Sequence, residues 1–193
     1  MRPWKRKRGM LRGGARYVTV LEPAERALLG ELSATVADAL IGRAQSAPKD
    51  ELSELTGMPS GHAEAPNDPR LARLLPDFAA EGEESVEGEN RLMRQLHESD
   101  IVKGKLIDLR AIIEALEPAD NGQVSLTEEQ ANQWIAAINS LRLYLHAALE
   151  GHDGPIAKAE ETDAMYQWLS YNHKTERLRF IHRLLDFAED CFA

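Results

Sequence analysis

Apolar residues recur at helical spacing along much of this chain, and local signals mark where each helix begins or ends. In the first stretch the spacing is four residues throughout, over Leu28, Leu32, Val36 and Leu40. Glu22-Pro23 precedes it, and proline suits the first turn of a helix because its φ angle is already helical. We expect one helix that begins there, runs to about Arg43 and buries a single face.

Two further apolar stripes predict long helices in the middle of the chain. The first repeats at spacings of four and three residues, over Val102, Leu106, Leu109, Ile113 and Leu116. We expect its helix to begin at Ser99-Asp100 and to end at Pro118, with a separate helix from about Glu84 to His97. The second stripe follows the capping pattern Thr127 to Gln130 and comprises Trp134, Ile138, Leu141 and Leu145.

Short extended segments accompany these helices. Residues 3 to 21 predict a β-hairpin, because Gly13-Gly14 is a turn signal and β-branched or aromatic residues follow it. Val124 to Leu126 predicts a further strand, which we expect to pair with the hairpin. The sequence therefore favours a mainly α fold: a helical bundle with a small antiparallel β-sheet, formed by the N-terminal hairpin and the short strand near residue 125.

Length and composition are typical of a soluble globular domain. The 193 residues are 43% hydrophobic, and no apolar run reaches the roughly eighteen residues of a membrane span. We expect a single domain over residues 1–193, with a flexible loop or linker at 46–68, where proline, glycine and short polar residues cluster. The basic start is not followed by the apolar stretch of a signal peptide, so we expect a cytoplasmic protein.

The N-terminal arm is the strongest charge feature of the chain. Seven of the 23 basic residues, and none of the 32 acidic ones, lie in the first sixteen positions. Such an asymmetry suggests an anionic partner, or docking of the arm on the acidic remainder of the chain, and it does not name the partner. The candidate nucleic-acid contacts are Trp4, Lys5, Arg6, Lys7, Arg8 and Arg12, with the cations on phosphates and the indole stacked on a base. In the alternative interpretation the same charges lie at a sheet edge, where they prevent aggregation, or they lie against the acidic remainder of the chain.

The sequence contains no motif that indicates catalysis, a metal site or a cofactor. His146 and Glu150 stand one helical turn apart, but the further ligands of a zinc or di-iron site do not follow. Glycine-rich phosphate loops and nucleophile motifs are missing as well. We therefore expect no enzyme, no cofactor and no small-molecule substrate. Arg142, between two apolar residues, is expected to anchor a carboxylate.

The end of the chain predicts a last helix with a wide apolar surface. One stripe comprises Leu178, Ile181, Leu185 and Phe192, and a second comprises Phe180, Leu184, Phe187 and Cys191. Either the helix is central to the core, or the first stripe forms a homodimer or partner surface. Cys191 is the single cysteine of the sequence. Exposed beside a cation it would be a redox-active thiol, and buried among apolar residues it would be inert.

Several segments resemble one known family in their order and spacing. They are Trp4-Lys5-Arg6, Val20 to Leu29, Asp68 to Asp77, Trp134 to Leu145 and Tyr166 to Leu169. Over nearly its whole length the chain is similar to actinobacterial domain-of-unknown-function family twenty-seventeen. The resemblance implies a largely uncharacterised group in which some members are transcriptional regulators that sense oxidants through a cysteine pair. With one cysteine, this sequence cannot form such an intramolecular switch.

These features together favour a non-enzymatic regulator. We expect a cytoplasmic regulatory or adaptor protein that acts through protein–protein interaction, with another protein or as a homodimer. The alternative is a transcriptional regulator that contacts DNA through its basic N-terminal arm. No membrane partner is expected, since the sequence lacks a membrane-spanning segment.

Overall fold

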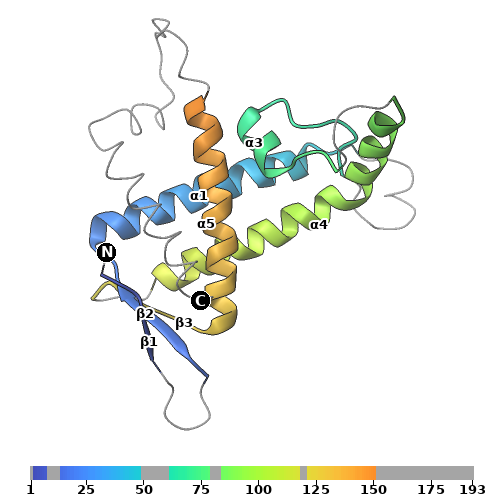
Figure 1. Ribbon diagram of the computed structural model, residues 1–193. Helices are drawn as coiled ribbons and strands as arrows, with labels where there is room; N and C mark the ends of the chain where they lie inside the picture. The colour runs from blue at the N-terminus through green and yellow to red at the C-terminus, as the bar shows by residue number, and fades with distance from the viewer. Residues whose placement is uncertain (1, 8–13, 49–60, 79–83, 118–120, 151–193) are drawn as a thin grey trace, which may run out of the picture.

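The computed structural model describes residues 2–7, 14–48, 61–78, 84–117 and 121–150. Its elements in chain order are β1 (Lys5–Lys7), β2 (Arg16–Val20), α1 (Pro23–Gln45), α3 (Pro69–Leu74), α4 (Glu84–Leu116), β3 (Gln123–Leu126) and α5 (Glu128–Glu150). The long helix α5 crosses α1 and α4 (Figure 1). The small sheet lies at one end of α5, and α3 packs near the other. The predicted mainly α fold with a small antiparallel sheet is confirmed.

The three strands form one antiparallel sheet in the order β1-β2-β3, so the strand predicted near residue 125 does pair with the hairpin. Tyr17 on β2 lies opposite Leu126 on β3. Gly122 makes the turn before β3, with a φ angle of 72°, and its carbonyl oxygen accepts a hydrogen bond from the Leu21 amide at 2.8 Å. A Cβ atom at this position would collide with the Leu21 carbonyl oxygen, so the turn requires glycine.

Helix α1 begins at the predicted Glu22-Pro23 signal. The Glu22 amide donates to the Glu25 carboxylate at 3.0 Å as one half of a capping box. The buried residues of the helix are Leu29, Leu32, Ser33, Val36 and Leu40. The predicted stripe is thus confirmed except at its start, where Leu28 is half-buried and Leu29 takes the core position. A period of 3.6 residues explains the shift, because a strict spacing of four drifts off the buried face.

Helix α4 is one continuous helix of 33 residues, so the predicted break before Ser99-Asp100 is wrong. Arg94 and Glu98 stand one turn apart just before that point, and their ion pair is almost fully buried. A serine-aspartate cap is a local preference, and buried contacts on both sides of it outweigh that preference. The second half of the helix buries Val102, Leu109, Ile112 and Leu116, whereas Leu106 and Ile113 are half-buried.

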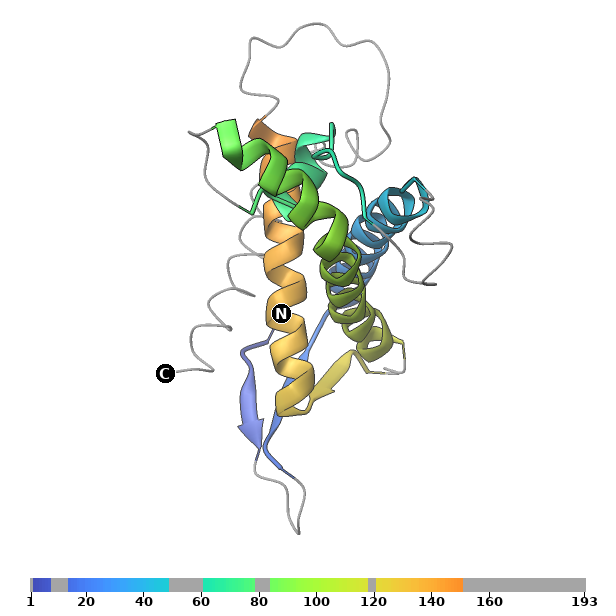
Figure 2. The same ribbon diagram turned by 90° about the vertical axis from the view of Figure 1, so that its right-hand side faces the viewer.

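Helix α5 contributes more buried hydrophobic residues than any other described element. The Thr127 amide donates to Gln130 Oε1 at 3.0 Å, and the Gln130 amide donates to Thr127 Oγ1 at 3.2 Å, which is the predicted reciprocal cap. The predicted face is buried, with Trp134, Ile138, Leu141 and Leu145 all in the core. Figure 2 shows α5 running from the sheet at one end to α3 at the other, with α4 crossing it.

The predicted loop at 46–68 is described only at its two ends. Residues 46–48 and 61–68 contain no helix or strand, and 49–60 lie outside the described residues. The flexible loop and the single domain over 1–193 stay predictions. No helix in the described ranges is long and apolar enough to cross a membrane.

Candidate functional site

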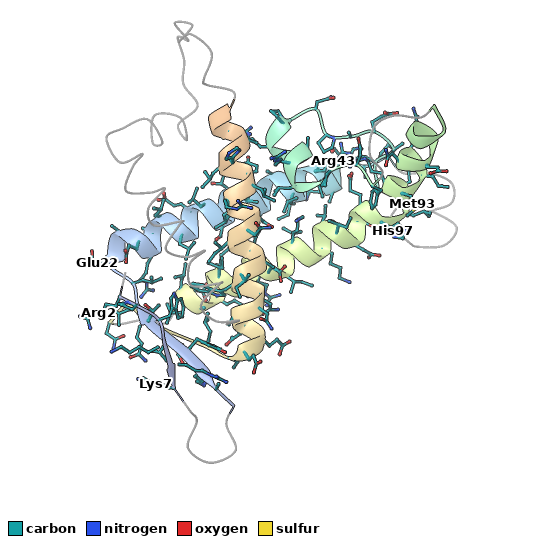
Figure 3. The ribbon with its side chains drawn as sticks, in the orientation of Figure 1. Arg2, Lys7, Glu22, Arg43, Met93 and His97 are labelled. Carbon is teal, nitrogen blue, oxygen red and sulfur yellow. The ribbon has the colours of Figure 1, made fainter. Side chains whose placement is uncertain are left out.

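The described part of the basic arm forms the outer edge of the sheet. All three residues of β1 are exposed, and β1 is an edge strand. Lys7 lies opposite Arg16 on β2, so cations gather at this edge, near the lower end of the view in Figure 3. Arg8 and Arg12 lie outside the described residues. The predicted contact of this arm with nucleic acid stays a prediction.

Trp4 differs from the rest of the arm because it packs against the core. Its ring meets the ring of Trp134 edge to face, with centroids 5.8 Å apart and planes at 81°. Trp134 is fully buried, and its Nε1 donates to the Ala111 carbonyl oxygen on α4 at 3.2 Å. The indole of Trp4 therefore fastens the arm to the helices. Stacking on a base would require Trp4 to leave this contact.

A cluster of buried charges joins the end of α1 to α4. Glu98, 3% exposed, accepts hydrogen bonds from Arg43 Nε at 2.8 Å and from Arg94 Nη1 at 3.0 Å. Arg94, 1% exposed, also donates to Asp77 Oδ1 at 2.6 Å and to the Leu75 carbonyl oxygen at 3.1 Å. Each buried charge thus has an opposite charge beside it, which is the condition under which a desolvated ion is tolerated.

The charge cluster also holds residues 61–78 against the helices. Arg43 Nη2 donates to the Glu64 carbonyl oxygen at 2.5 Å, and the Gly61 amide donates to the Gln95 carbonyl oxygen at 2.8 Å. A Cβ atom on Gly61 would lie 2.8 Å from the backbone of α4, so this close approach depends on glycine. The segment is therefore fixed to α1 and α4 at its beginning.

Helix α3 fastens the same segment to α5. Asp68 caps α3 by accepting from the Arg70 amide at 2.9 Å, and its carboxylate pairs with the Arg70 guanidinium at 3.0 Å. Arg70 also lies over the ring of Tyr144 on α5, 5.3 Å from its centre. Burial alone would raise the pKa of Asp68, but the hydrogen bonds and the charge of Arg70 outweigh it and hold that pKa below its ordinary value.

Two rows of exposed, mainly apolar side chains run along α4. In the first row Met93, His97 and Ile101 repeat every four residues, which places them on one side of the helix (Figure 3). The Phe78 ring lies 6.1 Å from the His97 ring, and the Phe78 amide donates to Asn90 Oδ1 at 2.9 Å. Phe78, Met93 and Ile101 are all exposed. We name Phe78, Met93, His97 and Ile101 the Met93 surface.

The last residue of the second row, Ile107, lines a groove between the end of α1 and the middle of α4. The row consists of Leu92 and Leu96, each 56% exposed, and Ile107, 48% exposed. The groove has a volume of about 430 Å³. Its apolar lining comes from Ala44 on α1, from Ala47 just after that helix, and from Val102, Leu106 and Ile107 on α4. Lys103 and Arg110 also line it, and we name it the α1–α4 groove.

A second hollow, of about 630 Å³, lies between the start of α1 and the end of α4. Arg26 lines it, and its Nη2 donates to the carbonyl oxygen of Leu116 in the last turn of α4. A cation is favoured there because the carbonyl oxygens at a helix C-terminus carry partial negative charge. The Arg26 guanidinium therefore caps the C-terminus of α4.

The expected role of Arg142 as a carboxylate anchor is wrong. Arg142 is exposed, and it donates to Asn139 Oδ1 at 3.0 Å on its own helix. Arg43 and Arg94, and not Arg142, pair with the buried carboxylate, which belongs to Glu98. The sequence did contain a signal for one of them, because Arg94 and Glu98 stand at the spacing of an ion pair on one helical face.

The predictions for the end of the chain fall outside the described residues. They concern the partner surface at Leu178, Ile181, Leu185 and Phe192 and the redox thiol of Cys191. These stay predictions. Among the residues that the structure describes, no three His, Cys, Asp or Glu side chains gather as metal ligands do.

Comparison with known proteins adds a family to this geometry. The family described as a domain of unknown function (DUF2017) matches residues 1–175. The chain is 41% identical over 168 residues to the "Oxidative stress regulator AosR" of Mycobacterium tuberculosis (strain H37Rv), which covers 80% of this chain and 74% of that protein. The same name and figures hold for Mycobacterium bovis (strain AF2122/97). A relative from Mycobacterium leprae is 39% identical over 159 residues, which covers 78% of this chain and 72% of that protein. No solved structure matches significantly.

Proposed function

The chain belongs to the family of the domain of unknown function DUF2017, and from that premise we propose that it is a cytoplasmic regulatory or adaptor protein without catalytic activity. It acts by binding another protein. The regulatory part of the proposal is supported by the name of its mycobacterial relatives, which describes oxidative stress regulators.

The Met93 surface carries the proposal that the partner is a protein. Three apolar side chains of this surface, Phe78, Met93 and Ile101, are exposed on one side of the molecule's longest helix and beside it. Grouped exposed apolar residues of this kind are typical of interaction sites. Methionine suits such a site, because its flexible thioether side chain adapts to the shape of a partner.

Contacts at Asp77 and Phe78 hold one side of this surface in place. Phe78 is fixed by its bond to Asn90, and Asp77 beside it pairs with the buried Arg94. Because the backbone that leads to Phe78 is held before any partner arrives, binding there loses less conformational entropy. The buried charge cluster thus prepares the Met93 surface for a partner.

A capture experiment with the full chain tests this proposal. Tagged wild-type protein should retain a stoichiometric protein partner from native lysate, and Met93→Glu should lose at least nine-tenths of it. Ile41→Glu is the matched control, because Ile41 on α1 is exposed to the same extent, 38%, but lies outside the Met93 surface. Recovery of the wild-type protein alone, or equal loss in both variants, would refute the proposal.

A second candidate function is DNA binding through the N-terminal arm. The observation that favours it is the exposed row of three cations on β1 with Arg16 beside it. Three phosphate contacts predict that the logarithm of the binding constant falls with the logarithm of salt concentration at a slope of roughly −2.7. Binding of a short DNA duplex by fluorescence anisotropy measures this slope. If the protein does not bind DNA even at low salt, this candidate is excluded.

A further inference from the structure

The α1–α4 groove has one face of α4 as its long wall. The lining residues of this wall are either direct neighbours or three positions apart, which places them on one side of the helix. They are Ser99, Val102, Lys103, Leu106, Ile107 and Arg110. From Ser99 to Arg110 the wall extends for about 16 Å, because a helix rises by about 1.5 Å per residue. The groove volume of about 430 Å³ is typical of a site for a small organic molecule.

Apolar side chains form most of the groove lining. Leu106 and Ile107 contribute from α4, and Ala44 and Ala47 contribute from the end of α1 and just after it. Ile107 is 48% exposed, so an apolar occupant would remove from water a side chain that the fold leaves uncovered. Removal of apolar surface from water favours binding. The groove therefore suits a molecule with a hydrocarbon part.

The polar groups near the start of the groove already have partners. Glu98 accepts hydrogen bonds from Arg43 and Arg94, and His62 Nε2 lies 2.8 Å from the Arg43 carbonyl oxygen. The two arginines are balanced by two carboxylates, since Arg94 also pairs with Asp77. The buried charge cluster thus brings no net charge to the groove, and the preferred charge of an occupant depends on the other end.

Lys103 gives the other end of the groove a positive charge. It is exposed, and among the described residues it has no ion-pair partner. Asp100 stands three positions before it but neither lines the groove nor pairs with it. Arg110 also lines the groove, and its charge is balanced by Glu114, whose carboxylate lies 2.5 Å from Arg110 Nε. An occupant with a single negative charge is therefore favoured.

We propose that the α1–α4 groove binds a free medium-chain aliphatic carboxylate, with its carboxylate group beside Lys103 and its alkyl chain against Ala44 and Leu106. An extended chain of roughly ten carbon atoms is about 12 Å long, because each carbon–carbon bond measures about 1.5 Å, and the wall on α4 is longer than this. The groove shares no residue with the Met93 surface. The inference is therefore independent of the proposed function.

Isothermal titration calorimetry of the full chain with decanoate tests the proposal, at concentrations too low for micelles. We expect saturable binding of one molecule per chain. Decyltrimethylammonium has the same alkyl chain with a positive head group, and it should bind about tenfold more weakly because Lys103 repels it. Acetate lacks the alkyl chain and should show no measurable binding. The absence of saturable decanoate binding, or equal affinity for the ammonium compound, overturns the proposal.

Two substitutions locate the binding site. Ala44→Phe places a large ring in the groove and should weaken decanoate binding about tenfold, because it displaces the alkyl chain. Ala34→Phe is the matched control and should leave the affinity unchanged, because Ala34 is also exposed on α1 but does not line the groove. Equal decanoate affinity in the two variants would place the molecule elsewhere and refute the assigned site.

Lys103→Gln tests the position of the carboxylate. This exposed substitution keeps the test valid even if Ala44→Phe does not fold. It should weaken decanoate binding about threefold, since an exposed ion pair contributes modestly, and it should reduce the difference in affinity between decanoate and decyltrimethylammonium. Lys7→Gln makes the same change on β1 and should alter neither affinity. Unchanged affinities in Lys103→Gln would overturn the proposal.

Discussion

Replacing Glu98 by glutamine tests whether the buried charge cluster stabilises the fold. Its carboxylate accepts hydrogen bonds from Arg43 Nε at 2.8 Å, Arg43 Nη2 at 3.2 Å and Arg94 Nη1 at 3.0 Å. Breaking a buried ion pair typically costs about 3–5 kcal/mol, because the remaining charge stays buried without its partner. Arg94 keeps Asp77, and Arg43 keeps the Glu64 carbonyl oxygen. We therefore expect the lower limit of this range, about 3 kcal/mol.

Thermal and urea unfolding of the full chain measure this loss. A chain of this size loses about 2–4 °C in Tm per kcal/mol, so Glu98→Gln should lower the Tm by roughly 6–12 °C. The urea midpoint should fall while the slope of the transition stays unchanged. Glu114→Gln is the matched control: it makes the same change on the same helix, but Glu114 pairs with Arg110 in an exposed contact worth at most about 0.5 kcal/mol. Equal loss of stability in both variants would refute the reasoning.

Three further predictions follow from single contacts. Gly122→Ala should lower the free energy of unfolding by about 2 kcal/mol, because the φ angle of Gly122 is 72° and the added Cβ would collide with the Leu21 carbonyl oxygen. Gly42→Ala is the control and should not lower the free energy of unfolding, because nothing lies near the added Cβ in that helix. Equal effects of the two substitutions in urea unfolding would contradict this. The pKa of Asp68 is lowered in the folded protein, so the ionised Asp68 stabilises the fold. Its contribution to the free energy of unfolding is fully present above the ordinary pKa of 3.8 and is lost as the pH falls through the lower pKa of the folded state. The stability difference between wild type and Asp68→Asn should therefore shrink between pH 7 and pH 2, and a constant difference would count against the ion pair. Trp134→Ala should cost about 3–5 kcal/mol and expose Trp4 to water, seen as a red shift of the remaining tryptophan fluorescence; an unchanged emission maximum would refute the contact.

The parts of the fold that depend on neighbours in sequence could be predicted. The cap between Thr127 and Gln130 joins residues three positions apart, and the buried face of α5 follows from helical periodicity alone. The pairing of the strand near residue 125 with the hairpin could also be inferred, because short strands need partners to satisfy their backbone groups.

The parts of the fold that depend on residues far apart in the sequence could not be predicted. The path of α4 through Ser99-Asp100 is stabilised by Glu98, whose partner Arg43 lies 55 positions away in the sequence. Periodicity marks apolar positions, so it assigns a charged side chain such as Arg94 to the surface although this one is buried. The sequence indicates that Trp4 is an accessible aromatic residue, because only the fold places Trp134 in contact with it.

The unbroken length of α4 has a mechanical consequence. At 33 residues it is a rod of about 50 Å, with Met93 and His97 toward one tip and the sheet at the other (Figure 3). If this rod tilts by about 10° around its contact with α5 at Ala111, the tip at Glu84 moves by roughly 7 Å and the tip at Leu116 moves by roughly 1 Å in the opposite direction. A large displacement at the Glu84 end is thereby coupled to a small displacement beside the sheet.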